Sequence, residues 1–274
     1  MKRIFSLLAL FFCISSVYAE GTPFGDGEIL KYNIRFKWGL VMVKAGTANY
    51  AVQGSSYENN SAYKTTLDFR SSPFFDGVFK IRDTLFSYMN TDLEPLYHIR
   101  KINEGKTRFQ EEVFVIDHDV NYTKVRVRRQ SAETVKFDTL LVSDNAGYDM
   151  LSIFAFARTL DYPNLEQNQT FRISSFVGTD KVNITVHFKG QAILEKSESV
   201  KYKACRLSVD IGDSAFNETK NAMEIWVSDD KNHIPLKIKA KLKIGAAEAD
   251  LTSWQNLKYP FASEITIPAS RLKK

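Results

Sequence analysis

Apolar and polar side chains alternate along most of this chain, and that rhythm restricts its fold more than any other feature. Leu30, Tyr32 and Ile34 alternate with polar residues, and the rhythm returns in segments 63–70, 125–127, 182–188, 205–209 and 236–244. Successive side chains of a β-strand point to opposite faces, so this pattern predicts strands with one buried and one solvated face. Turn-forming residues between the segments favour antiparallel pairing. The sequence therefore predicts an all-β, mainly antiparallel protein whose curved sheet forms a roll or an incomplete barrel.

One segment near the middle of the chain has the period of a helix instead. Met150, Ile153, Phe154 and Ala157 are spaced at i, i+3, i+4 and i+7, and Asp149 precedes them. This spacing places the four side chains on one helical face, and aspartate is a favoured N-cap residue. We expect a single short helix over about 150–159 that either joins two halves of the protein or plugs an open end of the sheet. Asp149 is interpreted as a cap rather than as an acid catalyst.

The first residues have the pattern of a secretory signal peptide. Lys2 and Arg3 precede an apolar run over residues 4–14, and small residues end the segment at Ala19. Such a signal is removed on export, and a membrane-spanning helix would need about 20 apolar residues. We therefore expect a cleaved signal over residues 1–19, a single β domain over residues 20–274, no membrane span, and a periplasmic or cell-envelope location.

Composition narrows the classes of protein that remain. Removal of 19 residues from 274 leaves 255, which is long enough to bury a sizeable core. Cys205 is then the remaining cysteine, so an internal disulfide is excluded. Removal of Lys2 and Arg3 lowers the formal charge from +5 to +3. A nucleic-acid partner is not expected, because it would normally require a concentrated basic patch.

Three stretches, taken together, resemble a known family. They are Gly27–Ile34 with Trp38-Gly39 and Ala45-Gly46, then Tyr148–Ser152, and then Ile225–Asp230 with Ile234-Pro235-Leu236 and Ile244-Gly245. Their order and spacing are similar to those of the bacterial exported-protein family called domain of unknown function 3108 (DUF3108). The resemblance implies an all-β envelope protein of Gram-negative bacteria with no established reaction. It implies no functional residues.

The sequence contains no strong catalytic or metal-binding motif. The densest polar triplet is Asp117-His118-Asp119, but neighbouring side chains of a strand point to opposite faces, which suits a shared metal poorly. His98, His187 and His233 are scattered, and Cys205 alternates with apolar residues as a buried, inert thiol would. We therefore expect no catalytic residue, no metal and no cofactor.

Two features are candidates for ligand binding. The first is a row of four lysines, Lys237, Lys239, Lys241 and Lys243, which would project from one face of a strand. It is interpreted either as a solvated or edge-protecting face or as a docking strip for anionic headgroups, phosphorylated glycan or an acidic partner. Trp226 is either a core anchor or a ligand-facing residue.

The second feature is the aromatic segment around residues 72–79. Phe74, Phe75 and Phe79 lie in a segment that also contains proline and glycine, where no obvious core strand would bury them all. An incomplete barrel with an aromatic mouth can hold an apolar ligand when side chains do not fill its interior.

Three functions remain open from these observations. The leading hypothesis is a non-catalytic binding or carrier module for a lipid, glycolipid or other amphiphilic envelope component. The first alternative is a structural or assembly factor that binds another envelope protein through a sheet edge or the lysine row. The second alternative is an enzyme acting on cell-wall glycan, which would need paired carboxylates across a cleft.

Overall fold

The computed structural model describes residues 21–77, 80–105, 110–119, 122–131, 133–144, 147–212 and 220–266. The predicted signal peptide and Phe79 lie outside these residues. The helical segments are α1 (Pro73–Asp76), α2 (Ser152–Thr159) and the 3₁₀ helix η1 (Tyr162–Asn164). The strands are β1 (Glu28–Trp38), β2 (Val41–Tyr57), β3 (Asn60–Ser71), β4 (Arg82–Met89), β5 (Pro95–Ile102), β6 (Gln110–His118), β7 (Thr123–Ser131), β8 (Val135–Ser143), β9 (Gly147–Tyr148), β10 (Thr170–Val177), β11 (Asp180–Glu195), β12 (Val200–Ile211), β13 (Met223–Ser228), β14 (Pro235–Lys241), β15 (Ala246–Gln255) and β16 (Glu264–Thr266).

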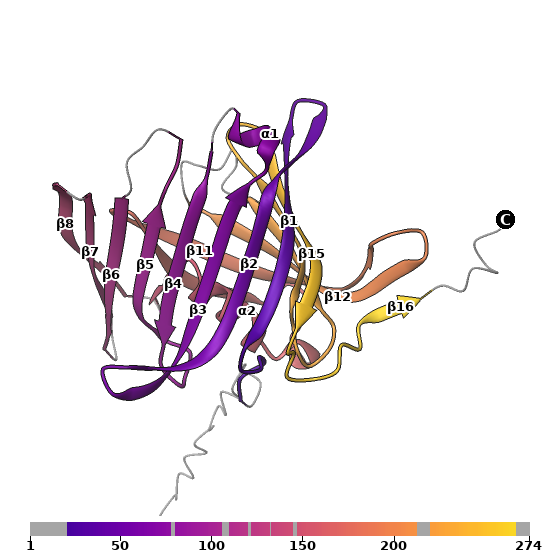
Figure 1. The fold of residues 1–274 in the computed structure, drawn as a ribbon. Helices are drawn as coiled ribbons and strands as arrows, with labels where there is room; N and C mark the ends of the chain where they lie inside the picture. Colours follow the sequence, from indigo (N-terminus) through magenta and orange to yellow (C-terminus); the bar gives the residue numbers. More distant parts are fainter. Residues whose placement is uncertain are drawn as a thin grey trace, which may run out of the picture.

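The described strands form one sheet of sixteen members. Its order is β8-β7-β6-β5-β4-β3-β2-β1-β15-β14-β13-β12-β11-β10-β9, and β16 adds to β12. Neighbours are antiparallel except for β9, which pairs in parallel with β10 over two residues. Two meanders are thus joined where β1 pairs with β15, which brings the two ends of the domain together. The predicted all-β, antiparallel architecture is confirmed (Figure 1).

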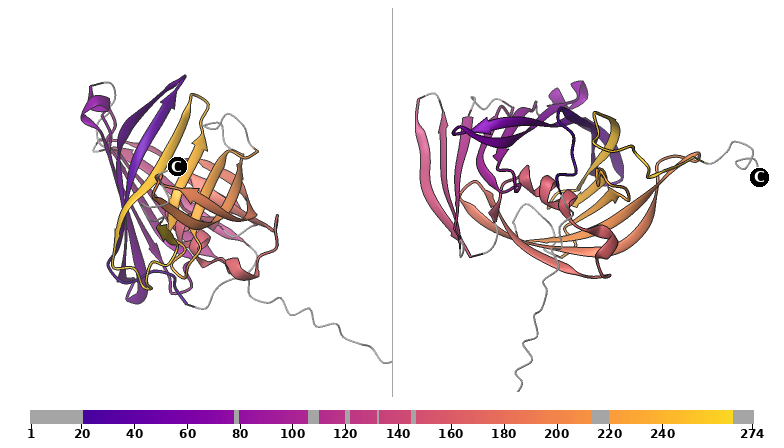
Figure 2. Two further views of the ribbon diagram at one scale, coloured as in Figure 1. Left: turned by 90° about the vertical axis from the view of Figure 1, so that its right-hand side faces the viewer. Right: turned by 90° about the horizontal axis from the view of Figure 1, so that it is seen from below.

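The sheet curves into a nearly closed barrel whose two ends overlap (Figure 2). Its edge strands are β8 and β9, and a side-chain hydrogen bond of 2.8 Å joins the hydroxyl of Ser143 on β8 to that of Ser174 on β10. Phe176 of β10 is fully buried against Phe114, Val125 and other apolar residues of β6 and β7. Apolar packing and not strand pairing joins the two edges of the described sheet at this seam, so the barrel is nearly closed, and the predicted roll or incomplete barrel is confirmed.

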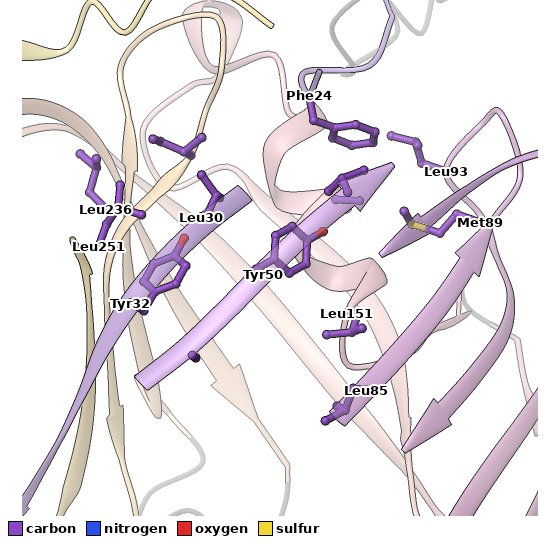
Figure 3. Close-up of a cluster of buried hydrophobic side chains, with 14 of the residues drawn as sticks. Phe24, Leu30, Tyr32, Tyr50, Leu85, Met89, Leu93, Leu151, Leu236 and Leu251 are labelled. Carbon is purple, nitrogen blue, oxygen red and sulfur yellow. The ribbon is translucent and has the colours of Figure 1, made fainter. Parts of the chain in front are cut away.

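Helix α2 fills one end of the barrel, as the right-hand view of Figure 2 shows. Leu151 and Ala155 pack with residues of β1, β2 and β4 such as Leu30 and Tyr50 (Figure 3). On its other side, Phe156 packs with the inner face of β10 to β13. The helix was predicted over about 150–159 and begins two residues later, at Ser152. Of the two predicted roles, joining two halves or plugging an end of the sheet, the helix has the second. We call the end that it fills the closed end.

Two glycines permit close approach where the sheet bends. A Cβ on Gly46 would lie 2.2 Å from the backbone oxygen of Arg70, and the register between β1 and β2 shifts beside it. Gly245 has φ +77°, and a Cβ there would lie 2.1 Å from the backbone oxygen of Lys37. Only glycine allows backbones to approach this closely. The β14–β15 turn is thereby held against the end of β1.

The helices of the described residues are short. None of them combines the length and the apolar character that a membrane-crossing helix needs.

Candidate functional site

The inner face of the barrel changes character from the closed end to the opposite, open end. Tyr32, Val227, Leu236 and Leu251 belong to the buried core at the closed end. The next inward-facing row consists of Ile34, Ala249, Ile238 and Ile225, which lie side by side on β1, β15, β14 and β13. Every member of this row, which we call the apolar row, is only partly buried. The interior is therefore packed at one end and leaves apolar surface accessible at the other.

The wall of the barrel formed by β4 to β7 carries ion pairs on the same inner face. Arg100 donates to Asp83 at 3.3 Å and to Glu104 at 3.0 Å. Arg129 pairs with Glu112, whose carboxylate is almost fully buried. Burial and the neighbouring Asp83 carboxylate raise the pKa of Glu104. The open end thus presents partly buried apolar side chains on one wall and paired charges on the other.

The carboxylates Asp83 and Glu104 form the kind of close pair that an acid–base enzyme uses. Both are bonded to the same guanidinium, that of Arg100. Asp83 also accepts the backbone N–H of Asn103 at 2.9 Å. These bonds hold the start of β4 against the end of β5 and the residues that follow it, so their geometry fits an ion-pair role.

A second polar cluster is sealed beneath the open end. Asp149, Ser87 and His98 are all fully buried, and the Ser87 hydroxyl donates to the Asp149 carboxylate at 2.6 Å. The His98 ring lies 3.3 Å from the same carboxylate. Serine bonds to aspartate here and not to histidine, so the serine is not activated as a nucleophile. Asp149 also accepts the backbone N–H groups of Leu151 and Ser152 at the start of α2, which supports its predicted capping role, although Leu151 occupies the N-cap position.

The lowered pKa values of two buried histidines imply that the stability of the fold depends on pH. Burial lowers the pKa of His98 below its usual 6.5, against the opposing pull of Asp149 and Glu112, with Arg100 adding to the decrease. Burial also lowers the pKa of His233, whose ring donates to the backbone oxygen of Arg158 at 2.9 Å. The folded state then binds fewer protons than the unfolded state, so stability is complete above about pH 6.5 and is lost as pH falls below it.

We expect the free energy of unfolding, measured by urea denaturation, to fall between pH 7.5 and pH 5.5 by up to about 1 kcal/mol per pH unit for each histidine. The variant His98→Phe should show a shallower dependence. An identical slope in the variant and the parent would contradict the assignment to His98.

The structure places the predicted aromatic residues at the open end. Phe74 and Phe75 lie on α1, which Ser72 caps and Pro73 begins. Phe75 packs edge-on against Phe36 of β1 with 6.4 Å between ring centroids, whereas Phe74 is 71% exposed. A single helix was predicted from the sequence, over about 150–159, and this helical turn was missed, although serine followed by proline is a start signal for a helix.

Two of the four lysines in the row lie close to acidic residues of β15. Lys237 lies 3.0 Å from Glu248 and 3.2 Å from Asp250, both on β15. Lys239 lies 3.9 Å from Glu248 and over the ring of Trp226, at 5.4 Å. Lys241 ends β14, and Lys243 lies in the following turn. Because β14 is paired on both sides, these lysines do not protect an edge.

Trp226 lies on this same face of β13, which is opposite to the face that α2 contacts. Its neighbours across the strands are Arg206 and Lys237, and Arg206 stacks on its ring at 5.7 Å. Trp226 and the lysine row are therefore together on the outer face, separated by the sheet from the apolar row.

The other titratable candidates have local structural contacts. The His118 ring lies 2.7 Å from the backbone oxygen of Pro95, and His187 pairs with Asp210 at 2.8 Å. Cys205 is buried as predicted, and burial together with Asp229 raises the pKa of its thiol to about 12. In the part of the chain that the structure describes, no group of three histidine, cysteine or acidic residues is placed to hold a metal ion.

The fold and the site define a class of protein, an antiparallel β-barrel that a helix closes at one end and that is open at the other. No curated protein matches the chain by sequence. The chain belongs to the family described as "Protein of unknown function (DUF3108)", whose family model matches residues 31–252. The family predicted from the three sequence stretches is confirmed.

Two crystal structures are similar in shape. The first is a beta-barrel-like protein of domain of unknown function DUF1849 from Brucella abortus, which is 11% identical and has a TM-score of 0.60. The match covers 85% of this chain and 98% of that chain, so the two share a fold. The second is described as a "putative lipoprotein" from Parabacteroides distasonis, with 8% identity, coverage of 86% and 99%, and a TM-score of 0.31. That score is too low to support an argument about this chain.

Proposed function

We propose that this protein is an exported, non-catalytic binding or carrier protein of the cell envelope, which holds a lipid, glycolipid or similar amphiphile in the open end of its barrel. The apolar row carries the proposal, because four inward-facing apolar side chains on adjacent strands keep part of their surface accessible. Barrels whose interior is not filled by side chains enclose ligands in this way. The signal-like first 19 residues support export.

The charged wall supports an amphiphilic ligand rather than a purely apolar one. Arg100 and Arg129 provide guanidinium groups within the interior, and each retains partial exposure beside its carboxylate partners. A guanidinium can bond a second acceptor, such as a phosphate or a sugar hydroxyl, while it keeps an ion pair. The ligand would place its apolar part against the apolar row and its polar part toward these arginines.

The test is native mass spectrometry of the mature protein, purified gently from an envelope fraction, followed by solvent extraction of any bound molecule. We expect one amphiphile per chain. The fraction of chains that carry the amphiphile should fall by about tenfold or more in Ile238→Asp, because a charged side chain would replace an apolar one that contacts the apolar part of the ligand. Ala249→Trp should have a similar effect by filling the space without adding charge.

Lys239→Gln is the matched control, since it lies next to Ile238 on β14 but on the outer face. It should retain the ligand. A folded parent protein that carries no amphiphile under these conditions, and binds none when lipid is added, would refute the proposal.

An assembly factor remains a second candidate because β8 is an edge strand with exposed apolar side chains. Val135, Leu140 and Val142 are all exposed on it. An edge of this kind can pair with a strand of another protein. An empty barrel together with a protein partner that is lost on Leu140→Lys would favour this candidate.

A further inference from the structure

Exposed apolar side chains gather at the open end of the barrel. Three separate turns contribute them, namely the β1–β2 turn, α1 and the β14–β15 turn. The exposed fractions are 100% for Leu40, 61% for Val41, 38% for Met42, 71% for Phe74 and 68% for Ile244. We call these five residues the apolar tip. Large apolar side chains scattered singly on a surface are ordinary, but a contiguous group of them marks an interaction site.

Phe36, on the strand that leads into the β1–β2 turn, lies between the other two segments of the apolar tip. Its ring packs against Phe75 of α1, and Phe75 in turn packs against Phe74 with 6.0 Å between ring centroids. The Phe36 ring also lies 3.1 Å from the position that a Cβ on Gly245 would occupy. The β14–β15 turn and α1 therefore flank the same residue of β1. A shallow cavity of about 350 Å³ between β2 and α1, lined by Val43, Lys44 and Phe74 among others, lies beside the tip.

The charge behind the tip is positive. Residues 29–57 contain four lysines or arginines and no acidic residue, and residues 231–247 contain five lysines and no acidic residue. Glu248 and Asp250 pair with Arg35, Lys237 and Lys239 of this set. Among the described residues, Lys37, Lys44 and Lys243 are exposed and form no ion pair. Asp76 of α1 is itself bound by Arg82.

The spacing of the lysines from the tip matches a membrane interface. Lys37 and Lys44 lie three and four residues from Leu40 on the two strands of one hairpin, which is about 10–13 Å along a strand. Apolar groups of interfacial proteins reach about 5–10 Å into the bilayer, so the ammonium groups would lie at the level of the headgroups. We propose that the apolar tip and Lys37, Lys44 and Lys243 dock the open end of the barrel onto an anionic phospholipid bilayer.

The shape of the tip favours a bilayer over a protein partner. Its side chains project from three turns at the end of the molecule and do not form a flat face or a free strand edge. A bilayer accepts such separate projections without matching their shape, and anionic lipid complements the excess of lysine. This inference goes beyond the proposed function, because docking by the tip requires no ligand inside the barrel.

The test is sedimentation of the mature protein with vesicles of phosphatidylcholine alone or of phosphatidylcholine with phosphatidylglycerol. We expect binding to the anionic vesicles that weakens in high salt. Leu40→Asp and Ile244→Asp should each reduce vesicle affinity about tenfold or more, because an inserted apolar side chain is replaced by a charge that anionic lipid repels. The triple variant Lys37→Gln, Lys44→Gln, Lys243→Gln should lose a similar factor and most of the salt dependence.

The controls are Leu140→Asp and Ile193→Asp, which change side chains that are 59% and 54% exposed on β8 and β11, away from the tip. Both should bind vesicles as the parent does. The urea midpoint of each variant shows whether it is folded. Because Leu40 is fully exposed, Leu40→Asp is expected to have little effect on stability.

Three results would overturn the inference. They are no binding of the parent to anionic vesicles, an equal loss in tip and control variants, and a dimer in solution that Leu40→Asp dissociates, which would assign the tip to a second copy of the chain. If the parent protein does not bind vesicles but still carries an amphiphile in native mass spectra, the inference is wrong and the proposed function stands. Vesicle binding by a protein that never carries an amphiphile would support the tip and refute the carrier.

Discussion

Replacing Arg158 with alanine is expected to lower the free energy of unfolding by about 3–5 kcal/mol, because it leaves a buried carboxylate without its partner. The side chains of Arg158 and Glu28 are both completely buried. The guanidinium donates to both carboxylate oxygens of Glu28, to the backbone oxygen of Asn232 through Nε at 3.0 Å, and to that of Pro23 at 3.2 Å. One side chain of α2 thus holds the start of β1 and the β13–β14 turn at the closed end.

Urea unfolding followed by circular dichroism measures this loss. Arg126→Ala is the matched control, because Arg126 pairs with Asp138 through a similar fork but is 69% exposed. Exposed ion pairs contribute about 0–1 kcal/mol, so this variant should unfold almost as the parent does. Replacing both partners, Arg158→Met with Glu28→Leu, should recover part of the stability, since no uncompensated charge remains. Equal midpoints for Arg158→Ala and Arg126→Ala would show that the buried pair is not a major anchor.

The pattern of strands was predictable because a strand with one buried and one solvated face has apolar and polar residues in alternation. Leu30, Tyr32 and Ile34 do face inward, and Arg35 and Lys37, which follow them on the same strand, face outward. The helix was predictable from the i, i+3, i+4 spacing of its apolar residues, although Phe154 packs with the cluster of β1, β2 and β4 and Ala157 packs with that of β10 to β13. Its start was misplaced by two residues because Asp149 caps the helix from outside the N-cap position.

Long-range partners were not predictable, because local sequence carries no record of which strands become neighbours. The row of lysines on β14 looks like a free cationic strip until β15 places Glu248 and Asp250 beside it. Arg158 follows an apolar helical pattern and would be expected at the surface, yet its partner Glu28 lies 130 residues away in the chain.

The candidate site was only partly visible in the sequence for the same reason. The aromatic residues of α1 were singled out, and Phe74 and Phe75 do lie at the open end. The apolar row was not singled out as a site, because Ile34, Ala249 and Ile238 come from three strands that meet only in the folded sheet. Leu40, Val41 and Met42 form a consecutive apolar run beside Gly39, and a run of that kind next to a glycine was the available signal.

Asp149→Ala is expected to destabilise the fold by at least about 3 kcal/mol, because it removes the acceptor for several buried donors at once. The carboxylate accepts the Ser87 hydroxyl at 2.6 Å and the backbone N–H groups of Leu151 and Ser152 at 2.7 Å and 3.1 Å. The backbone N–H of Asp149 donates in turn to the Ser152 hydroxyl at 2.9 Å, which gives the reciprocal geometry of a capping box. Without the carboxylate, α2 loses its cap and its link to β4.

The isosteric variant Asp149→Asn separates the hydrogen bonds from the charge. Its amide oxygen can accept both backbone N–H groups of α2, and its NH₂ group can donate to the Ser87 oxygen once that hydroxyl rotates. We therefore expect Asn to retain most of the stability that Ala loses, as measured by urea unfolding at pH 7.5, where the neighbouring His98 is neutral. If Asn proved as damaging as Ala at this pH, the charge itself and not the cap would be what the buried cluster requires, and the reading of Asp149 as a structural cap would have to be abandoned.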